Sequence, residues 1–209
     1  MTHRSFRLII VASALVLLTA ASGYAQTPAK PYVPTTDDPM RFVAFAIQMT
    51  QGAAGTLDIR IERWTTDAER NELLKLVAVT TDHPNDQRKL ADKLQDIKPR
   101  VGYIRTSNSM GWDLKYAYQR ELKDGTRQIV IATDKPLTFM AVARGARTVD
   151  YAISLIEMHF PKGSDKGEGK LLGQSQLSVK DGALQIEIYG QEPTRLSTIT
   201  QEYPKIEKK

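Results

Sequence analysis

The sequence predicts a mainly β fold with some helix (α+β), either an antiparallel β-barrel or a two-layer sandwich of about nine strands. Three observations support this prediction. Segments in which apolar and polar residues alternate, as they do in half-buried strands, recur along the chain. Short turns join most of these segments, which favours antiparallel pairing. A helical pair interrupts the series between the second and third strands.

The first 25 residues have the pattern of a secretory signal peptide. Arg4 and Arg7 precede an apolar run from Leu8 to Ala21, and small residues lie just before a cleavage site at Gln26. The apolar run is shorter than the roughly 20 residues that a spanning helix needs. We therefore expect an exported protein, periplasmic or extracellular, with no transmembrane anchor after cleavage.

Composition divides the rest of the chain into three parts. Residues 26–39 contain four prolines and predict an extended linker. Residues 40–202 predict a single β-rich domain, and residues 203–209 a charged C-terminal tail. Because the chain has no cysteine, burial alone must stabilise this domain.

The first two strands are predicted over residues 41–50 and 56–64, joined by a turn of small residues at 51–55. In the second strand, apolar Leu57 and Ile59 alternate with charged Asp58. This alternation predicts a strand with one buried and one solvated face.

Two helices are expected next. Thr66 and Glu69 fit a capping box, in which each side chain accepts a hydrogen bond from a free backbone N–H group. A helix is therefore predicted over residues 67–79, and a second one that begins after Pro84 and is ended by Lys98-Pro99. The apolar residues expected to face the core are Leu73, Leu74, Leu76 and Val77 in the first helix and Leu90, Ala91, Leu94 and Ile97 in the second.

Two Asp-Gly pairs predict β-hairpins with two-residue turns. The turn at residues 124–125 would place Tyr118 opposite Ile131. The turn at residues 181–182 would place Leu177 opposite Ile186.

The remaining strands follow from local pattern. Residues 149–160 are the most apolar segment, which predicts a central strand buried on both faces. Residues 161–169 are rich in glycine and charge and predict an exposed loop. Residues 194–200 predict the final strand.

Four segments resemble a group of exported bacterial proteins that has no assigned activity. They are RWTTDAER (63–70), RVGYIRTSNSMGWDLKYA (100–117), RQIVIATDKP (127–136) and GEGKL (167–171). The resemblance covers most of the mature chain. It implies a shared fold and export, and it assigns no catalytic residue.

The composition excludes several classes of function. Without cysteine there is no thiol catalysis, zinc–thiolate site or iron–sulfur cluster, and only His83 and His159 follow the leader. The glycines at 163–173 lack the spacing of a phosphate-binding loop. Basic residues are scattered, so no nucleic-acid partner is expected. We therefore predict no catalytic residues, no metal site and no cofactor.

An aromatic row is the predicted ligand-binding site. Trp112, Tyr116 and Tyr118 alternate along one segment and are expected on one face of a strand, with Arg105 upstream as a source of charge. Large amphipathic rings line many binding clefts. The same pattern is also typical of a strand's core face, and the sequence leaves the two interpretations open.

Three functional classes fit these observations. The first is an exported, soluble, non-enzymatic β-domain that binds a small or apolar ligand or an envelope partner, and we prefer it because the usual catalytic residues are sparse. The alternative is a metal-independent hydrolase that uses Glu157, His159 and Asp113. The third is a structural envelope protein recognised through an exposed sheet edge.

Overall fold

The computed structural model describes residues 32–48, 53–79, 84–106, 110–135, 137, 153–173, 175–180, 183–189 and 193–202. These residues, from Val33 on, belong to one compact unit. The predicted signal peptide, the C-terminal tail and the first part of the predicted linker lie outside the described residues. In the described part of the linker, the Asp38 N–H donates to the Thr35 hydroxyl and closes a turn.

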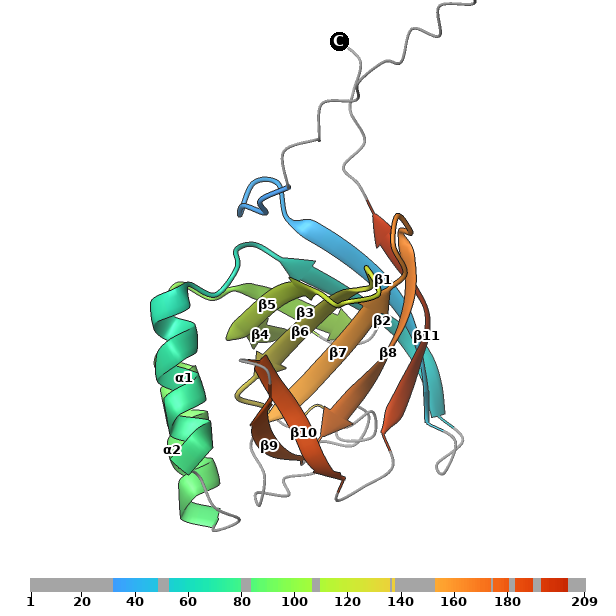
Figure 1. The fold of residues 1–209 in the computed structure, drawn as a ribbon. Coiled ribbons are helices and arrows are strands. Elements are labelled where there is room, and N and C mark those ends of the chain that lie inside the picture. Colours follow the sequence, from blue (N-terminus) through green and yellow to red (C-terminus); the bar gives the residue numbers. More distant parts are fainter. Residues whose placement is uncertain are drawn as a thin grey trace, which may run out of the picture. The chain divides into compact units, whose positions relative to one another are not determined.

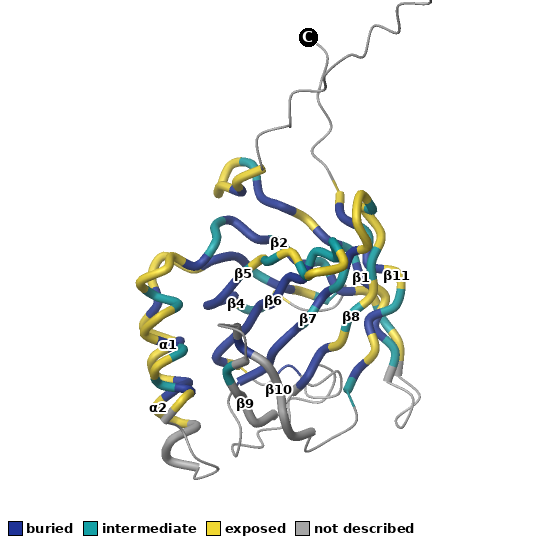
Figure 2. Tube along the Cα trace, in the orientation of Figure 1, coloured by how far each residue is buried: buried dark blue, intermediate teal, exposed yellow. Residues whose placement is uncertain are grey.

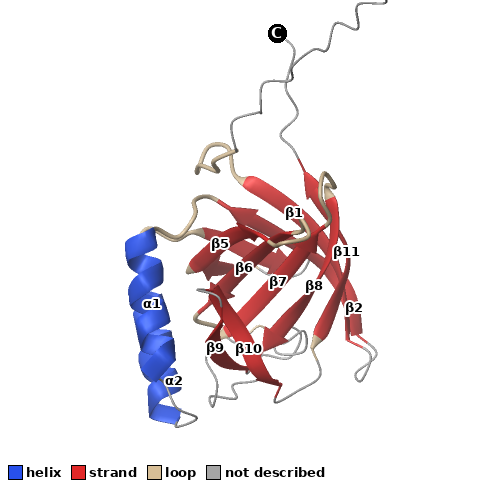
Figure 3. Cartoon of the chain, in the orientation of Figure 1, coloured by secondary structure: helices blue, strands red, loops and turns tan. Residues whose placement is uncertain are grey.

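Nine of the described strands form one antiparallel sheet in the order β4-β3-β2-β1-β11-β8-β7-β6-β5, which is nearly closed into a barrel (Figures 1 and 3). A separate hairpin contains the other two strands, β9 and β10. The predicted mainly β fold is therefore confirmed, in its barrel form. The strands are β1 Met40–Gln48, β2 Ala53–Ile61, β3 Gly102–Thr106, β4 Trp112–Leu114, β5 Tyr116–Glu121, β6 Arg127–Thr133, β7 Ser154–Phe160, β8 Lys166–Gly173, β9 Ser175–Lys180, β10 Ala183–Tyr189 and β11 Thr194–Glu202.

Apolar side chains fill the interior of the barrel. Every second residue of the strands points inward, so Phe42 on β1 meets Phe160 on β7 with their ring centroids 5.5 Å apart. Around this pair lies one contiguous cluster of buried residues from β1, β2, β3, β4, β5, β6, β7, β8 and β11. The barrel is thus held by a packed core, as the absence of cysteine requires.

The two helices, α1 (Asp67–Val79) and α2 (Pro84–Asp96), lie between β2 and β3 in the chain, as the sequence predicts. The capping box at the start of α1 is present, because the Glu69 carboxylate accepts from the Thr66 N–H and the Thr66 hydroxyl accepts from the Glu69 N–H. Both helices pack on the outside of the barrel (Figure 1). The eight apolar residues expected to face the core do so, with Leu74 and Leu76 only partly buried.

A second apolar cluster joins these helices to the outer face of β5, β6 and β7. From the sheet it includes Tyr116, Ala132 and Leu155, and from the β9–β10 hairpin it includes Leu184. Figure 2 shows the resulting buried residues on both the helices and the strands. Residues 149–152 of the predicted central strand lie outside the described residues. The part of β7 nearest Ile153 is buried on both faces, as predicted, but the prediction is wrong at Glu157 and His159, which are only partly covered.

The barrel closes where the chain passes Lys115, between β4 and β5. The Leu114 carbonyl accepts from the Val101 N–H just before β3, while the Lys115 N–H donates to Ala132 on β6. One continuous segment therefore contacts both ends of the sheet. Thr65 strengthens this closure, because its N–H donates to the Ala117 carbonyl and its hydroxyl accepts from the Ala117 N–H.

The two Asp-Gly hairpins differ in register. Leu177 lies opposite Ile186, as predicted. Tyr118 lies opposite Val130 instead of Ile131, so the predicted register of the β5–β6 hairpin is wrong by one residue. The reason is a three-residue turn, in which Gly125 has a φ of 80° and the Leu122 N–H donates to the Thr126 carbonyl.

Two segments predicted as turn or loop belong to strands. β2 begins at Ala53, within the predicted turn, because its small residues pair with the end of β1. β8 begins at Lys166, within the predicted loop. Its glycines lie where β7 is very close: a Cβ on Gly167 would be 2.3 Å from the His159 carbonyl oxygen. A glycine-rich strand therefore looks like a loop in the sequence.

Candidate functional site

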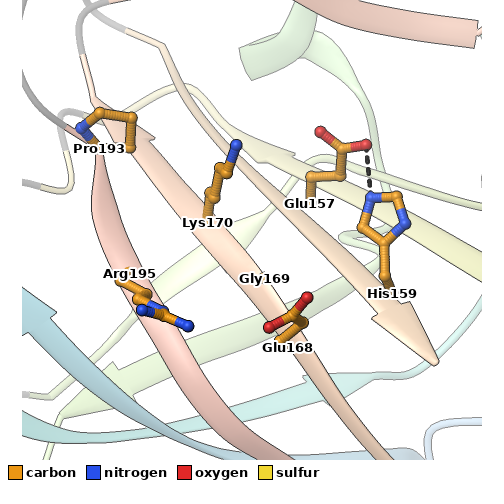
Figure 4. A pocket seen from close by; sticks show the side chains of 7 residues that line it. All are labelled: Glu157, His159, Glu168, Gly169, Lys170, Pro193 and Arg195. Atoms are coloured by element: carbon orange, nitrogen blue, oxygen red, sulfur yellow. Dashed lines mark hydrogen bonds and ion pairs between the residues drawn. The ribbon is translucent and has the colours of Figure 1, made fainter. Parts of the chain in front are cut away.

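A cavity of about 590 Å³ lies on the outer face of the barrel, over β7, β8 and the start of β11 (Figure 4). Its position follows from strand alternation, because Ile156, Met158 and Phe160 on β7 point into the barrel core. The intervening Glu157 and His159 therefore point outward, into the cavity. The lining residues are Glu157, His159, Glu168, Gly169, Lys170, Pro193 and Arg195.

Glu157 and His159 form a hydrogen-bonded pair in this cavity. The distance from Glu157 Oε1 to His159 Nε2 is 2.7 Å (Figure 4). The same carboxylate oxygen accepts from the side-chain amide of Gln128 on β6, which is itself buried. Gln128 in turn accepts from Arg120 on β5. A chain of polar side chains across three strands thus fixes the orientation of Glu157 and, through it, of the imidazole ring.

The charge state of Glu157 follows from these contacts. The hydrogen bond from His159 lowers the pKa of the Glu157 carboxyl below its ordinary value, while burial opposes the shift. The amide of Gln128 and the positive charge of Lys170 lower the pKa further. Glu157 is therefore ionised at neutral pH, and the His159 nitrogen that faces it carries the proton.

Three further charged side chains line the cavity from β8 and β11. The register places Glu168 opposite His159, Lys170 opposite Glu157, and Arg195 opposite Lys170. All three are exposed. In the described part of the chain, none of the three forms an ion pair with a neighbour, although opposite charges lie on adjacent strands. These groups are therefore available to a ligand.

Gly169 allows the floor of the cavity to form. A Cβ at this position would lie 2.3 Å from the Glu157 carbonyl oxygen and 3.0 Å from Ile199 on β11. Only glycine lets β8 come this close to β7. The close approach holds the charged residues on either side of Gly169 next to the Glu157–His159 pair.

The structure does not bring the four residues of the predicted aromatic site together. Trp112 packs against the core cluster inside the barrel, whereas Tyr116 and Tyr118 belong to the outer cluster beneath the helices. The prediction that they share one face is therefore wrong, because the chain changes faces at Lys115. Arg105 lies on β3, where it binds the Asp58 carboxylate at 2.8 Å. A ligand role for these residues remains a prediction.

Asp113, the third residue of the hydrolase hypothesis, also lies apart from the cavity. It is on β4, and its carboxylate accepts from Arg100 at 3.1 Å. Its backbone carbonyl accepts from Thr133 on β6. Glu157 and His159 are thus brought together as the strand alternation predicts, and Asp113 is absent from the cavity that they line.

Sequence reasoning missed three residues of the site, namely Glu168, Lys170 and Arg195. Residues 161–169 are predicted as an exposed loop, and Arg195 lies in the last strand, far from β8 in the chain. A signal existed on β8, where Lys166, Glu168 and Lys170 alternate with glycines. This is a strand pattern with a charged outer face.

The chain was compared with protein-family models, curated proteins and solved structures, and no match was found in any of the three. No helix in the described residues has the length and apolar character needed to span a membrane. The function must therefore be argued from the geometry of the site itself.

Proposed function

We propose that this protein is an exported binding protein that holds a small polar molecule in the cavity over β7, β8 and β11. The observation that carries the proposal is that three charged side chains, Glu168, Lys170 and Arg195, meet there without pairing to one another. Arg63 and Arg100, elsewhere on this barrel, have carboxylate partners. Glu168, Lys170 and Arg195 have none among the described residues, which leaves their hydrogen-bonding capacity for a ligand.

The size and chemistry of the cavity support a small polar ligand over an apolar one. Its volume of about 590 Å³ is within the range of small-molecule sites, roughly 300–1,000 Å³. Apolar side chains already fill the barrel interior, where an apolar ligand would otherwise bind. Transferring an apolar group to the charged outer surface would gain little, because the charges hold water.

Native mass spectrometry tests this proposal. The protein is expressed from its full-length sequence in its own host, purified from the envelope and sprayed under gentle conditions. We expect a retained small molecule that is lost in Glu168→Gln and Arg195→Gln variants but kept in Lys166→Gln. Lys166 is a matched control, since it is exposed on the same strand and does not line the cavity. Absence of any retained mass, or equal retention in all variants, would overturn the proposal.

The Glu157–His159 pair favours a second candidate function, a metal-independent hydrolase. With its Nε2 proton held by Glu157, His159 keeps a lone pair on Nδ1 that could take a proton from water. The hydroxide so formed would attack a carbonyl carbon, and the proton would pass to the leaving alkoxide. This is the base-and-orienting-carboxylate arrangement of many hydrolases, without a side-chain nucleophile.

Turnover of p-nitrophenyl acetate distinguishes the two candidates. A hydrolase should lose activity at least 100-fold in His159→Gln and by a smaller factor in Glu157→Gln. Asp113→Asn should leave the rate unchanged, because Asp113 is outside the cavity. Equal rates in the wild type and His159→Gln would exclude the second candidate and leave the first.

A further inference from the structure

We propose that Lys170 and Arg195 form an anion subsite, which binds a carboxylate or phosphate group of the ligand. The inference rests on the proposed function, and it specifies the chemical class of the molecule that the cavity holds. Figure 4 shows both side chains lining the cavity from the neighbouring strands β8 and β11.

The register of the sheet makes these two cations direct neighbours. Arg195 on β11 pairs with Lys170 on β8, and both side chains point to the outer face. Directly opposite residues in an antiparallel pair have Cβ atoms about 4.5–5.5 Å apart, and like charges in this position destabilise the sheet. The barrel therefore carries an electrostatic cost at the edge of its cavity.

The neighbouring carboxylates form no ion pair with either cation in the described part of the chain. Glu157 lies opposite Lys170, but its Oε1 atom is held by His159 and Gln128, and it forms no ion pair with Lys170. Glu168 lies two residues from Lys170 on the same strand and opposite His159. Within the residues that the structure describes, neither Lys170 nor Arg195 thus has an ion-pair partner, although the charge of Lys170 acts on Glu157 and lowers its pKa.

An oxyanion between the two cations would relieve their repulsion. The arginine guanidinium presents two parallel N–H donors that match a carboxylate or phosphate, and the lysine ammonium adds a point charge. Glu157 and Glu168, which also line the cavity, repel a second anion and accept hydrogen bonds. The remainder of the ligand should therefore carry hydrogen-bond donors, such as hydroxyl or ammonium groups.

The repulsion predicts two changes in Tm, one on removal of a cation and one on addition of an anion. Without an added anion, Lys170→Gln should raise Tm by about 1–3 °C at low salt, because it removes one of the two like charges. With sodium phosphate or sodium acetate added at constant ionic strength, the wild type should show a saturable rise in Tm. The rise should disappear in Lys170→Gln and Arg195→Gln and persist in Lys166→Gln.

The two anions distinguish the possible groups, since a larger response to one of them identifies phosphate or carboxylate as the preferred group. NMR titration of the Arg195 Nε–Hε resonance with the same salts places the binding site directly. An equal response of Tm in wild type and Lys170→Gln, or an Arg195 resonance that does not move, would overturn the subsite.

The anion subsite and the proposed function can fail independently in these experiments. A retained ligand that depends on the cavity but lacks an acidic group would overturn the anion subsite alone. Saturable binding of phosphate or acetate at Lys170 and Arg195, with no molecule retained from the host, would support the subsite and count against the proposed function.

Discussion

Two charged regions on the outside of the barrel differ in how their charges are paired. Near β2, β3 and β4, each arginine is matched by a carboxylate: Arg100 binds Glu62 through two hydrogen bonds of 2.9 Å, and Arg63 binds Glu69 in the same way. Over β7, β8 and β11, Lys170 and Arg195 lie side by side without such partners among the described residues. The ion pairs of the first region stabilise the fold, and we propose that the unpaired charges of the second bind a ligand.

In the paired region, the arginines join segments that lie far apart in the sequence. Arg63 also donates to the Pro99 carbonyl at 2.7 Å, and Arg100 also donates to Asp113. These contacts join the segment before α1 to the segment after α2 and to β4. The arginines therefore stabilise the points where the helical excursion leaves and rejoins the barrel, and little capacity remains there for a ligand.

The largest expected effect comes from removing the ion pairs of Arg100. In Arg100→Ala, the Glu62 carboxylate, which is only 9% exposed, loses a bidentate partner. We expect the free energy of unfolding to fall by about 2 kcal/mol, less than for a fully buried pair because Arg100 itself is 42% exposed. Urea denaturation measures the change. Arg195→Ala is the control and should stay within about 0.5 kcal/mol of the wild type. Equal losses in the two variants would contradict the comparison.

The second-largest expected effect is the loss of folding stability at acid pH when Glu69, the partner of Arg63, is protonated. The hydrogen bond from Arg63 lowers the pKa of Glu69 to about 2, from an ordinary value of 4.5. Because the folded pKa is the lower one, the stabilisation is fully present above pH 4.5 and is lost as the pH falls from 4.5 towards 2. After allowance for solvent screening, we expect Glu69→Gln to lose about 1–2 kcal/mol at pH 6.

Urea denaturation of the wild type and Glu69→Gln across this pH window measures the effect. The difference in unfolding free energy between the two proteins should shrink steadily towards zero as the pH approaches 2. A constant difference for Glu69→Gln would contradict the assignment.

A smaller effect concerns the one paired carboxylate of the cavity. Since the hydrogen bond from His159 is the largest cause of the lowered pKa of Glu157, His159→Gln should raise that pKa towards its ordinary value. Carbon-13 NMR of the labelled carboxyl group follows the titration directly. The carboxyl of Asp124, whose pKa is lowered chiefly by its contacts with Thr126, should change much less. An unchanged Glu157 titration would show that Gln128 and Lys170 are sufficient to lower the pKa of Glu157.

The smallest expected effect is the salt dependence of the two adjacent cations. Salt screens exposed charges, with a Debye length of about 10 Å at 0.1 M and about 3 Å at 1 M. The gain in Tm expected for Lys170→Gln should therefore vanish at 1 M sodium chloride. Lys166→Gln should show no gain at either concentration, as its partner Thr200 is uncharged. A gain for Lys170→Gln that persists in high salt would indicate a cause other than charge repulsion.

Local patterns were sufficient for the elements that depend on neighbours in the chain. The capping box fixed the start of α1 at Asp67, because both of its hydrogen bonds lie within four residues. The apolar stripe of α2 identified its buried face. The Asp-Gly pair at 181–182 predicted the pairing of β9 with β10 correctly, since hairpin register depends on the length of one short turn.

Local patterns failed where distant strands set the geometry. Alternation alone places Trp112, Tyr116 and Tyr118 on one face, but closure of the barrel at Lys115 moves the chain from one end of the sheet to the other. Similarly, the glycines of β8 predict a loop from the sequence alone, whereas in the structure they form a strand that packs closely against β7. In both cases a contact with a residue remote in the sequence overrides the local preference.

By itself, the sequence determined a helical pair, a β-rich domain without disulfides and the common face of Glu157 and His159, because each of these depends on composition or on residues a few positions apart. The tertiary structure alone decided that the sheet closes as a barrel and that Lys170 meets Arg195 beside that pair. The physical reason is that strand order and register arise from the burial of many side chains at once. No short segment contains that information.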